Sequence, residues 1–301
     1  MNNNIKKITL LDGGMGQELL KRSSRAVTPM WSAEVMLHEP DLVSDVHYDF
    51  IQAGAEVITL NSYTATPTRL TREGHLNKLE NLHASAIQVA KTAIQRAGKP
   101  NIQIAGCLPP LVASYKPEAA LSFDASLSEY RQLVELQSSG CDFFICETMS
   151  SIVEAHAACI AAQESGKKVW VAFSVKDDAS QKLRSGELLS KAIQDLEKLS
   201  PEAILLNCSK PEAINACWPI LEPIDCRIGA YANGFTSVEK LFPGDTVEHL
   251  AVRQDLTPDA YANIVLSWIA RGASIIGGCC EMGPAHIKKI ADCIQGDFVS
   301  S

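Results

Sequence analysis

The sequence predicts a single-domain (β/α)8 TIM barrel that covers residues 1–301. Eight short apolar runs, rich in Val, Ile and Leu, alternate with amphipathic or polar segments along the whole chain. Continuously apolar runs of this length are typical of strands that are buried on both faces. Their recurrence at intervals of roughly forty residues is typical of strand–helix units that close into a barrel.

The predicted strands begin near the N-terminus and end at a pair of adjacent cysteines. They cover residues 8–12, 56–62, 102–108, 142–148, 169–175, 203–209, 227–233 and 274–280. Each run is too short for an ordinary globular helix. No linker interrupts the alternation, so we expect one domain.

Helices are predicted wherever apolar residues recur on one face between two strands. The clearest patterns cover residues 41–53, 77–97, 127–139, 152–165 and 258–271. A glycine follows each of five helical segments, where a left-handed residue commonly ends a helix: Gly54, Gly98, Gly140, Gly166 and Gly272. Residues 233–257 show no clear element, and we expect them to form an elaborated loop over the active face.

The main rival fold is an open, doubly wound sheet. That fold usually carries a glycine-rich dinucleotide-binding loop after its first strand. Residues 12–16 read Asp-Gly-Gly-Met-Gly, which is a poor match to Gly-x-Gly-x-x-Gly. The barrel is therefore the favoured fold.

The composition argues against a nucleic-acid or membrane partner. The formal net charge is −8, and no basic run offsets it, whereas nucleic-acid-binding domains typically carry a basic patch. No apolar stretch is long enough to span a bilayer, and residues 1–7 lack the apolar core of a signal peptide. We therefore expect a cytoplasmic protein whose 10 cysteines are reduced thiols.

Polar side chains gather where the predicted strands end. They are Asp12, Asn61, Tyr63, Glu147, Thr148, Asn207, Cys208, Tyr231, Asn233, Cys279 and Cys280. All eight carboxyl ends of a barrel meet at one mouth, and the loops there carry the chemistry. We therefore expect these residues to converge although they lie far apart in the sequence.

Cys279 and Cys280 follow two glycines at the end of the last predicted strand. Adjacent thiols can share a metal ion, form a strained disulfide or fill space beside a turn. Neighbouring strand residues point to opposite sides, so both can meet one ion only if the backbone leaves regular geometry, and Gly277 and Gly278 would supply that freedom. Cys208, at the end of the sixth predicted strand, adds a third thiol and favours the metal.

Three thiolates favour a soft or borderline ion, and Zn2+ is the usual choice in a reducing compartment. Three protein ligands leave a fourth position open, as in catalytic zinc sites. The sequence contains no Cys-x-x-Cys pair of the kind found in structural zinc fingers or ribbons. The other cysteines are expected to fill the core: Cys107, Cys141, Cys146, Cys159, Cys217, Cys226 and Cys293.

Asp12 and Glu147 end the first and fourth predicted strands. A lone carboxylate at such a position can also cap a helix or pair with a lysine. Two carboxylates beside an anionic metal site suggest a cationic group on the substrate, such as an α-ammonium. The histidines show no repeated ligand spacing, and surface or helix-face roles are expected for all 7.

Several segments resemble the homocysteine S-methyltransferase family, whose zinc-dependent members include betaine-, S-methylmethionine- and cobalamin-dependent enzymes. The resemblance covers essentially the whole chain in the right order. It is carried by residues 12–19 (DGGMGQEL), 31–33 (WSA), 61–63 (NSY), 147–148 (ET), 207–209 (NCS) and 277–280 (GGCC). The Asn-Cys and Gly-Gly-Cys-Cys elements together are its most specific part.

The resemblance implies a (β/α)8 barrel in which Cys208, Cys279 and Cys280 hold zinc, and in which the metal binds the thiolate of homocysteine. It implies that Asp12 and Glu147 hold the amino group of homocysteine. It also implies that backbone amides near Gly13 and Ser32 hold the substrate carboxylate. Further substrate contacts are expected from Tyr63 and Asn233.

The expected partners are small molecules, namely homocysteine and a methyl donor. Little sequence follows Cys280, so we expect no folate- or corrinoid-binding domain and favour a small onium donor. S-methylmethionine or S-adenosylmethionine ranks ahead of betaine, with Trp31 or Tyr63 offering a cation–π contact. Delivery of the methyl group by a separate corrinoid protein, and selenocysteine as the acceptor, remain open.

Two departures from common family patterns leave the donor open. Residues 281–284 read Glu-Met-Gly-Pro where many members carry an arginine and threonines, and the loop after Val175 lacks the usual glycine-rich form. Two rival functions also remain: a barrel enzyme that binds phosphate at Gly277 and Gly278, and a non-catalytic, thiol-rich zinc sensor. The oligomeric state cannot be read from the sequence.

Overall fold

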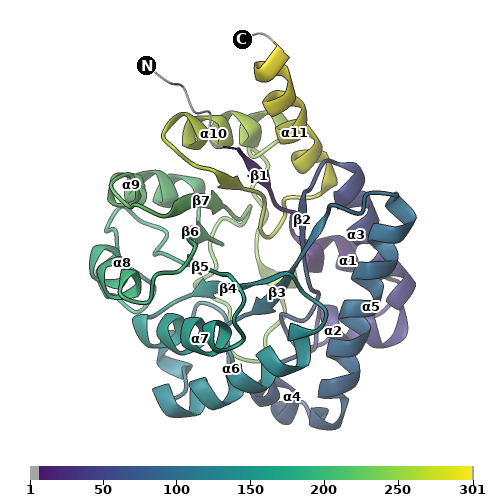
Figure 1. Ribbon diagram of the computed structural model, residues 1–301. Coiled ribbons are helices and arrows are strands. Elements are labelled where there is room, and N and C mark those ends of the chain that lie inside the picture. The colour runs from purple at the N-terminus through teal and green to yellow at the C-terminus, as the bar shows by residue number, and fades with distance from the viewer. Residues whose placement is uncertain (1–6, 300–301) are drawn as a thin grey trace.

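The computed structural model describes residues 7–299 and shows eight parallel strands that form a ring with helices around it (Figure 1). All eight predicted strands are confirmed, but most are shorter than expected, and the last ends at Ile276, so that Cys279 and Cys280 lie just after the strand. The strands are β1 (Thr9–Leu10), β2 (Val57–Thr59), β3 (Gln103–Leu108), β4 (Phe143–Met149), β5 (Val169–Phe173), β6 (Ala203–Asn207), β7 (Arg227–Tyr231) and β8 (Ile275–Ile276).

The sheet closes on itself between its first two strands. The strand order is β1-β8-β7-β6-β5-β4-β3-β2, and a parallel bridge joins Leu11 to Val57 across the remaining gap. The N–H of Asp12 donates to the carbonyl of Val57 at 3.0 Å, and the N–H of Glu56 donates to that of Leu10 at 2.8 Å. These bonds complete the predicted (β/α)8 barrel.

The five predicted helical segments are all helical, and further helices complete the ring. The helices are α1 (Met15–Arg22), α2 (Ser32–His38), α3 (Pro40–Gln52), α4 (Pro67–Arg72), η1 (Leu76–Lys78), α5 (Leu79–Ala97), η2 (Pro117–Ala119), α6 (Phe123–Ser138), α7 (Ile152–Glu164), α8 (Leu189–Glu197), α9 (Pro211–Leu221), η3 (Val247–His249), α10 (Pro258–Ala270) and α11 (Pro284–Val299). Helix α6 begins four residues before the predicted segment because Ser122 caps it, accepting a hydrogen bond from the N–H of Ala125.

Alternate residues of each strand pack into two separate apolar layers. In β4, Phe143 and Ile145 belong to the cluster inside the ring, whereas Phe144 and Cys146 belong to the larger cluster that includes the surrounding helices. Both faces of the strand are therefore buried, which explains why the apolar runs are continuous. Each fully buried large aliphatic or aromatic side chain stabilises the fold by about 1.5–3 kcal/mol.

The glycines after the predicted helices serve two different purposes. Gly98 has a φ of 64° and ends α5 in the left-handed conformation, and Gly54, Gly166 and Gly272 also have positive φ. The same prediction for Gly140 is wrong, because its φ is not positive. A Cβ at Gly140 would lie 2.4 Å from the side chain of Ile87, so this glycine is required for space.

Residues 233–257 form the predicted loop over the mouth of the barrel. A bridge between Phe235 and Val252 folds the loop back on itself. Phe235, Val238 and Val247 are buried in one cluster with Cys208 and Cys280. The loop therefore places an apolar cover next to the predicted cysteine site.

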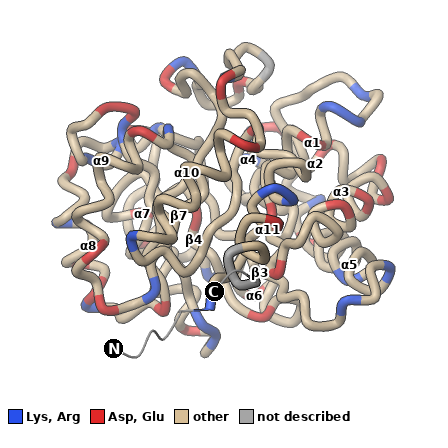
Figure 2. The backbone as a smooth tube through the Cα atoms, turned by 90° about the horizontal axis from the view of Figure 1, so that it is seen from above, with Lys and Arg blue, Asp and Glu red and all other residues tan. Residues whose placement is uncertain are grey.

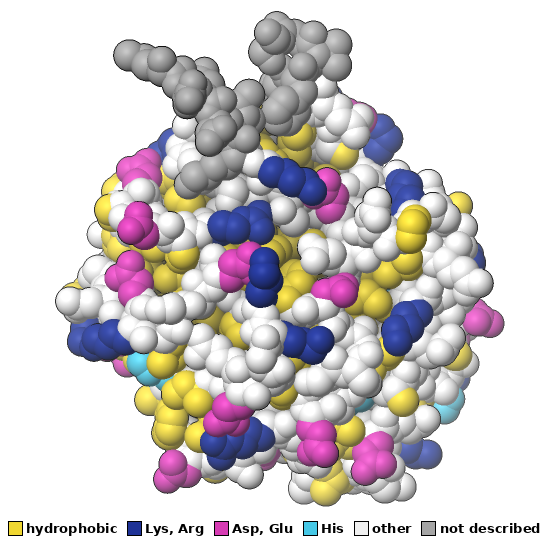
Figure 3. All heavy atoms as spheres, viewed as in Figure 1, with side chains coloured by type: hydrophobic (Ala, Val, Ile, Leu, Met, Phe, Trp, Pro, Cys, Tyr) yellow, Lys and Arg dark blue, Asp and Glu magenta, His cyan; other side chains and the backbone are white. Residues whose placement is uncertain are grey.

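Charged residues lie mainly on the outer helices and loops (Figure 2). On the face shown in Figure 3, basic and acidic side chains are interspersed and form no large patch of one sign. Within residues 7–299, no helix combines the length and apolar character needed to cross a membrane. The cytoplasmic location stays a prediction.

Candidate active site

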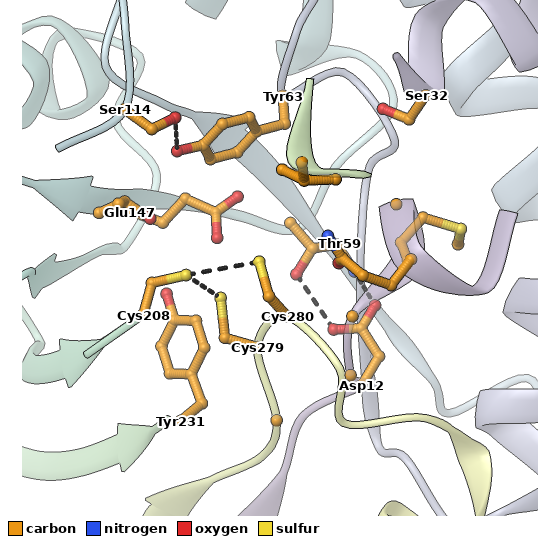
Figure 4. A pocket seen from close by; sticks show the side chains of 18 of the residues that line it. Asp12, Ser32, Thr59, Tyr63, Ser114, Glu147, Cys208, Tyr231, Cys279 and Cys280 are labelled. Atoms are coloured by element: carbon orange, nitrogen blue, oxygen red, sulfur yellow. Dashed lines mark hydrogen bonds between the residues drawn. The ribbon is translucent and has the colours of Figure 1, made fainter. Parts of the chain in front are cut away.

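A pocket opens at the carboxyl ends of the strands, and most of the predicted site residues line it (Figure 4). The predicted residues in its wall are Asp12, Gly13, Ser32, Tyr63, Glu147, Cys208, Cys279 and Cys280. The structure does not bring Asn233 into this wall. Asn233 is buried at the base of the loop after β7, where its Oδ1 accepts a hydrogen bond from the N–H of Phe235 at 3.1 Å.

The three predicted thiols form one cluster. Their sulfur atoms all lie within 4.8 Å of one another, with Cys208 Sγ 3.7 Å from Cys280 Sγ and 2.6 Å from Cys279 Sγ. Zinc–sulfur bonds in a tetrahedral site place sulfurs about 3.8 Å apart, close to the Cys208–Cys280 distance. Cys279 lies closer to Cys208 than a shared ion would hold it. The donor set fits a metal of the zinc type, since three thiols converge from the ends of two strands.

Gly277 and Gly278 make room for this arrangement. Neither has a positive φ, so the backbone leaves the regular strand after Ile276 without adopting the left-handed conformation. A Cβ at Gly277 would lie 2.6 Å from the Cβ of Leu11, and one at Gly278 would lie 2.4 Å from that of Met282. The N–H of Gly278 donates to the carbonyl of Asp12 at 3.0 Å. The glycines thus let the backbone after β8 lie directly against the backbone after β1.

The cluster concentrates negative charge on one sulfur. Burial opposes ionisation of Cys208, but hydrogen bonds from Cys279, Cys280 and Tyr115 hold the pKa of this thiol well below its ordinary value. The pKa values of Cys279 and Cys280 are raised well above the ordinary value, chiefly by their interaction with Cys208. Binding of a dication would compensate the charge of further ionisation.

Asp12 and Glu147 point into the same pocket. The N–H of Thr59 donates to Asp12 Oδ2 at 2.8 Å, and the thiol of Cys107 donates to Glu147 Oε1 at 3.0 Å. Burial, assisted by Glu147, raises the pKa of Asp12 to about 8, and burial raises the pKa of Glu147 to about 7. Within residues 7–299, the pocket wall around them contains no lysine or arginine. Both are therefore available to an external cation.

Strained backbone is concentrated around the pocket. Among the described residues 7–299, seven residues other than glycine have positive φ, and four of them line the pocket: Trp31, Tyr115, Thr148 and Cys208. A β-branched residue such as Thr148, at φ 62°, is a clear outlier for this conformation. Strain of about 1–3 kcal/mol per residue persists only where the surroundings enforce it, which is common at active sites.

Asn207 enforces the conformation at Thr148. Its Oδ1 accepts from the N–H of Thr148, and its Nδ2 donates to Thr148 Oγ1, both at 2.9 Å. The residue before Thr148 is Glu147 and the residue after Asn207 is Cys208. The asparagine therefore fixes the carboxylate relative to the first thiol.

Two contacts at this site were not predicted from the sequence. Tyr115 Oη lies 2.9 Å from Cys208 Sγ, yet its place in a long loop gave no sequence signal. Tyr231, which was expected among the converging strand-end residues, ends β7 and lines the pocket with a hydroxyl that has no partner in the described chain. Cys107 is buried as predicted, but its thiol also contacts Glu147.

The remaining predicted aromatic and histidine residues are also placed. Trp31 and Tyr63 line the pocket, so the predicted cation–π contact stays a prediction. No histidine of the described part of the chain lies in the wall of this pocket. His47 and His83 face the core rather than the surface, and burial lowers their pKa values to about 3 and about 4.

The chain is similar to several known methyltransferases. A family model described as Homocysteine S-methyltransferase matches residues 9–294. The Homocysteine S-methyltransferase of Escherichia coli (strain K12) is 30% identical over 305 residues, with 94% of each chain covered. A Selenocysteine Se-methyltransferase of Brassica oleracea var. italica is 26% identical over 310 residues, covering 93% of this chain and 87% of that protein. The crystal structure of the homocysteine methyltransferase MmuM from Escherichia coli, in its metallated form, has a TM-score of 0.80 and 25% identity, covering 95% of this chain and 96% of that chain.

Proposed function

The chain belongs to the homocysteine S-methyltransferase family, and we propose that it transfers a methyl group from S-methylmethionine or S-adenosylmethionine to the thiolate of L-homocysteine, giving methionine. One observation carries the proposal. Three thiols and two carboxylates that have no basic partner in the described chain share a single pocket. This set matches a substrate that combines a metal-binding sulfur with a cationic amine.

Cys208, Cys279 and Cys280 would hold a zinc ion in this proposal. Zinc, when bound, favours the thiolate form of a coordinated thiol at neutral pH, and the thiolate is the nucleophile in methyl transfer. The related MmuM structure is described as a metallated form, which supports a metal at the corresponding place.

The amino-acid part of homocysteine would be held on the opposite side of the pocket. Ionised Asp12 and Glu147 would bind the ammonium group by charge-assisted hydrogen bonds. Within residues 7–299, the N–H groups of Gly13 and Ser32 donate to no backbone carbonyl. Both residues line the pocket, and Gly13 lies just before the N-terminus of the eight-residue helix α1. These N–H groups would therefore receive the substrate carboxylate.

The charge of the pocket supports a cationic donor. Its wall contains Asp12 and Glu147 but, in the described chain, no lysine, arginine or histidine. S-methylmethionine and S-adenosylmethionine carry a net positive charge, whereas betaine is neutral overall, so the two sulfonium donors gain more from an acidic pocket. Trp31 and Tyr63 add aromatic faces that attract an onium group.

The methyl group would pass by in-line displacement. A bond forms between the homocysteine sulfur and the methyl carbon while the donor's bond to that carbon breaks, and its electron pair remains on the donor sulfur as a neutral thioether leaves. Phe235, Val247 and Leu250 of the loop over the mouth would keep water away from the reacting atoms. Holding the two partners at attack distance lowers the barrier by several kcal/mol.

A metal analysis followed by a donor screen tests the proposal. The purified chain is analysed for zinc and then incubated with homocysteine and one of four donors: S-methylmethionine, S-adenosylmethionine, betaine or a methylated corrinoid. We expect stoichiometric zinc and methionine formation with one of the two sulfonium donors. Selenocysteine is assayed as a second acceptor, because one relative is named a Selenocysteine Se-methyltransferase.

Other results would point to the rival functions. Retained phosphate without zinc would favour a phosphate-binding barrel enzyme. Stoichiometric zinc without methylation of either acceptor by any donor would favour a metal sensor. Methionine formed only with betaine or only with the corrinoid would overturn the proposed donor while leaving the reaction intact.

A further inference from the structure

Tyr115 brings a hydroxyl group directly onto the cysteine cluster. Its Oη lies 2.9 Å from Cys208 Sγ, and its side chain is only 9% exposed. The residue follows β3 in the loop before η2 and has a φ of 63°, a conformation that is unfavourable for a bulky side chain. The contact is therefore held in place by the surrounding structure at a cost in backbone strain.

Arg184 packs against the ring of Tyr115. Its guanidinium carbon lies 5.0 Å from the ring centroid, within the range of a cation–π contact. Arg184 forms an ion pair of 3.0 Å with Asp177, and the two side chains are only 6% and 7% exposed. Its Nε also donates to Ser174 Oγ at 2.9 Å. The guanidinium is thus fixed on several sides and can hold the tyrosine ring in one orientation.

The same loop links this arrangement to the backbone at Cys208. Asp177 Oδ1 accepts a hydrogen bond from the N–H of Lys210 at 3.3 Å, and Arg184 Nη2 lies 3.5 Å from the carbonyl oxygen of Cys208. Arg184 and Asp177 both lie in the loop that follows β5. The loop after β5 therefore supports Tyr115 and Cys208 together.

The proposed function creates a problem of selectivity that this arrangement can address. Three protein thiolates would lie beside the substrate thiolate, and all four sulfurs can attack a methyl donor. Attack by Cys208 would form a bond from its sulfur to the methyl carbon and break the donor's bond to that carbon, leaving the electron pair on the departing group. The product is S-methylcysteine, a thioether that can no longer serve as a thiolate ligand.

We propose that Tyr115, held by Arg184, is a positioning residue that donates a hydrogen bond to Cys208 Sγ and protects this sulfur from methylation. A hydrogen bond to an ionised acceptor is roughly twice as strong as one between neutral groups. It occupies a lone pair on the thiolate and lowers its nucleophilicity. The substrate sulfur receives no such bond from Tyr115, so methyl transfer is directed toward it. This inference rests on the proposed zinc-dependent function.

Tyr115→Phe removes the hydroxyl and keeps the ring, and Tyr130→Phe is the matched control. The hydroxyl of Tyr130 is also buried and donates to the carbonyl of Pro109 at 2.9 Å, but it belongs to α6 and is not part of the pocket wall. Each protein is loaded with excess zinc, its zinc content is measured, and it is treated with iodomethane without homocysteine. Iodomethane methylates a thiolate with loss of iodide and does not depend on the natural donor. Peptide mass spectrometry then gives the rate of methylation at each cysteine.

We expect Cys208 to be methylated about tenfold faster in Tyr115→Phe than in the unaltered chain, which corresponds to the loss of one charge-assisted hydrogen bond. Tyr130→Phe should leave the rate unchanged, and Arg184→Lys, which keeps a cation for Asp177 but loses the planar stacking group, should give a smaller increase. If Tyr115→Phe no longer holds zinc, Arg184→Lys carries the test.

An unchanged Cys208 rate in zinc-loaded Tyr115→Phe, or faster methylation only at Cys279 and Cys280, would overturn the inference. If Tyr115→Phe does not hold zinc, an unchanged rate of Cys208 methylation in Arg184→Lys would also overturn the inference. Failure of the proposed function would instead be seen in the unaltered chain, as a lack of zinc or of methionine formation. The two failures are therefore distinguishable.

Discussion

Asn207 and Thr148 exchange two hydrogen bonds of 2.9 Å across the carboxyl ends of β6 and β4. Thr148 directly follows Glu147, and Asn207 directly precedes Cys208, so the pair fixes the positions of Glu147 and Cys208 relative to each other. A short polar contact in the wall of the barrel thus sets the distance between the carboxylate of Glu147 and the sulfur of Cys208, the proposed metal ligand.

Asn207→Ala should therefore impair both stability and catalysis. The substitution leaves the buried N–H of Thr148 without its acceptor, which costs about 1–3 kcal/mol of unfolding free energy. Glu147 also loses its fixed position, and we expect kcat/KM for homocysteine to fall by about tenfold or more. Urea denaturation and steady-state kinetics measure the two effects. Asn81→Ala, at an exposed position of α5, is the control and should change the unfolding free energy by less than about 0.5 kcal/mol.

Cys208→Ala should remove the metal and the activity together. The variant keeps only two adjacent thiols, so it no longer offers the three-thiol donor set. Metal analysis should show zinc below stoichiometry, and methionine formation should fall below detection. Cys293→Ala is the control, because this half-buried thiol of α11 is not one of the three clustered thiols. A Cys208→Ala protein that is free of zinc and fully active would refute the proposed role of the metal.

Substrate binding should depend on pH through the two carboxyl groups. Burial raises the pKa of Glu147 to about 7 and that of Asp12 to about 8, and only the ionised forms bind an ammonium group strongly. The affinity for methionine, the expected product, should therefore rise by about tenfold or more from pH 6 to pH 8. Methionine has no thiol proton, so calorimetric titration isolates the carboxyl groups. A flat profile, or an unchanged one in Glu147→Gln, would argue against this role.

The same pKa values predict the stability of the unliganded chain. Folding raises the pKa of Glu147 from 4.5 to about 7 and that of Asp12 from 3.8 to about 8. Between about pH 4 and pH 8, the folded chain therefore binds more protons than the unfolded chain. This contribution to stability is fully present below about pH 4 and is lost as the pH rises through about 7 to 8. Thermal unfolding of unliganded Asp12→Asn should show a weaker loss over this range than the unaltered chain.

Gly13→Ala should disrupt the turn that begins the site. A Cβ at Gly13 would lie 2.0 Å from the carbonyl oxygen of Met282 and 2.8 Å from the ring of Phe50, so the backbone must move. We expect a loss of about 1–3 kcal/mol of unfolding free energy and a loss of homocysteine binding, measured by denaturation and calorimetry. Gly296→Ala in α11 places the added Cβ within 4 Å of no atom of the described residues and should be neutral or slightly stabilising.

The fold could be predicted because a strand buried on both faces appears in the sequence as a continuous apolar run. The apolar periodicity that indicates a helix was weaker for several helices. Helix α9, for example, contains Pro219, a residue that usually ends a helix. Helix α1 follows two glycines and spans only eight residues, so its pattern was too short to recognise.

The site could be predicted to the extent that its residues end strands, because the barrel brings those ends together. Tyr115 lies outside any strand, and its contact with Cys208 depends on the path of a long loop. The steric requirement for glycine at positions 277 and 278 could not be predicted either, because the atoms that crowd Gly277 and Gly278 come from Leu11 and Met282. Contacts between distant segments leave no local pattern.

The first and last strands meet inside the pocket, where the N–H of Gly278 donates to the carbonyl of Asp12. Asp12 leaves the ribosome early and Cys279 and Cys280 leave it among the last residues of the barrel. A chain still being synthesised has Cys208 without its two companions, and the three-thiol site forms only when β8 joins β1. If the three thiols hold the proposed zinc, the metal content of a preparation gives the fraction of molecules in which the barrel is complete.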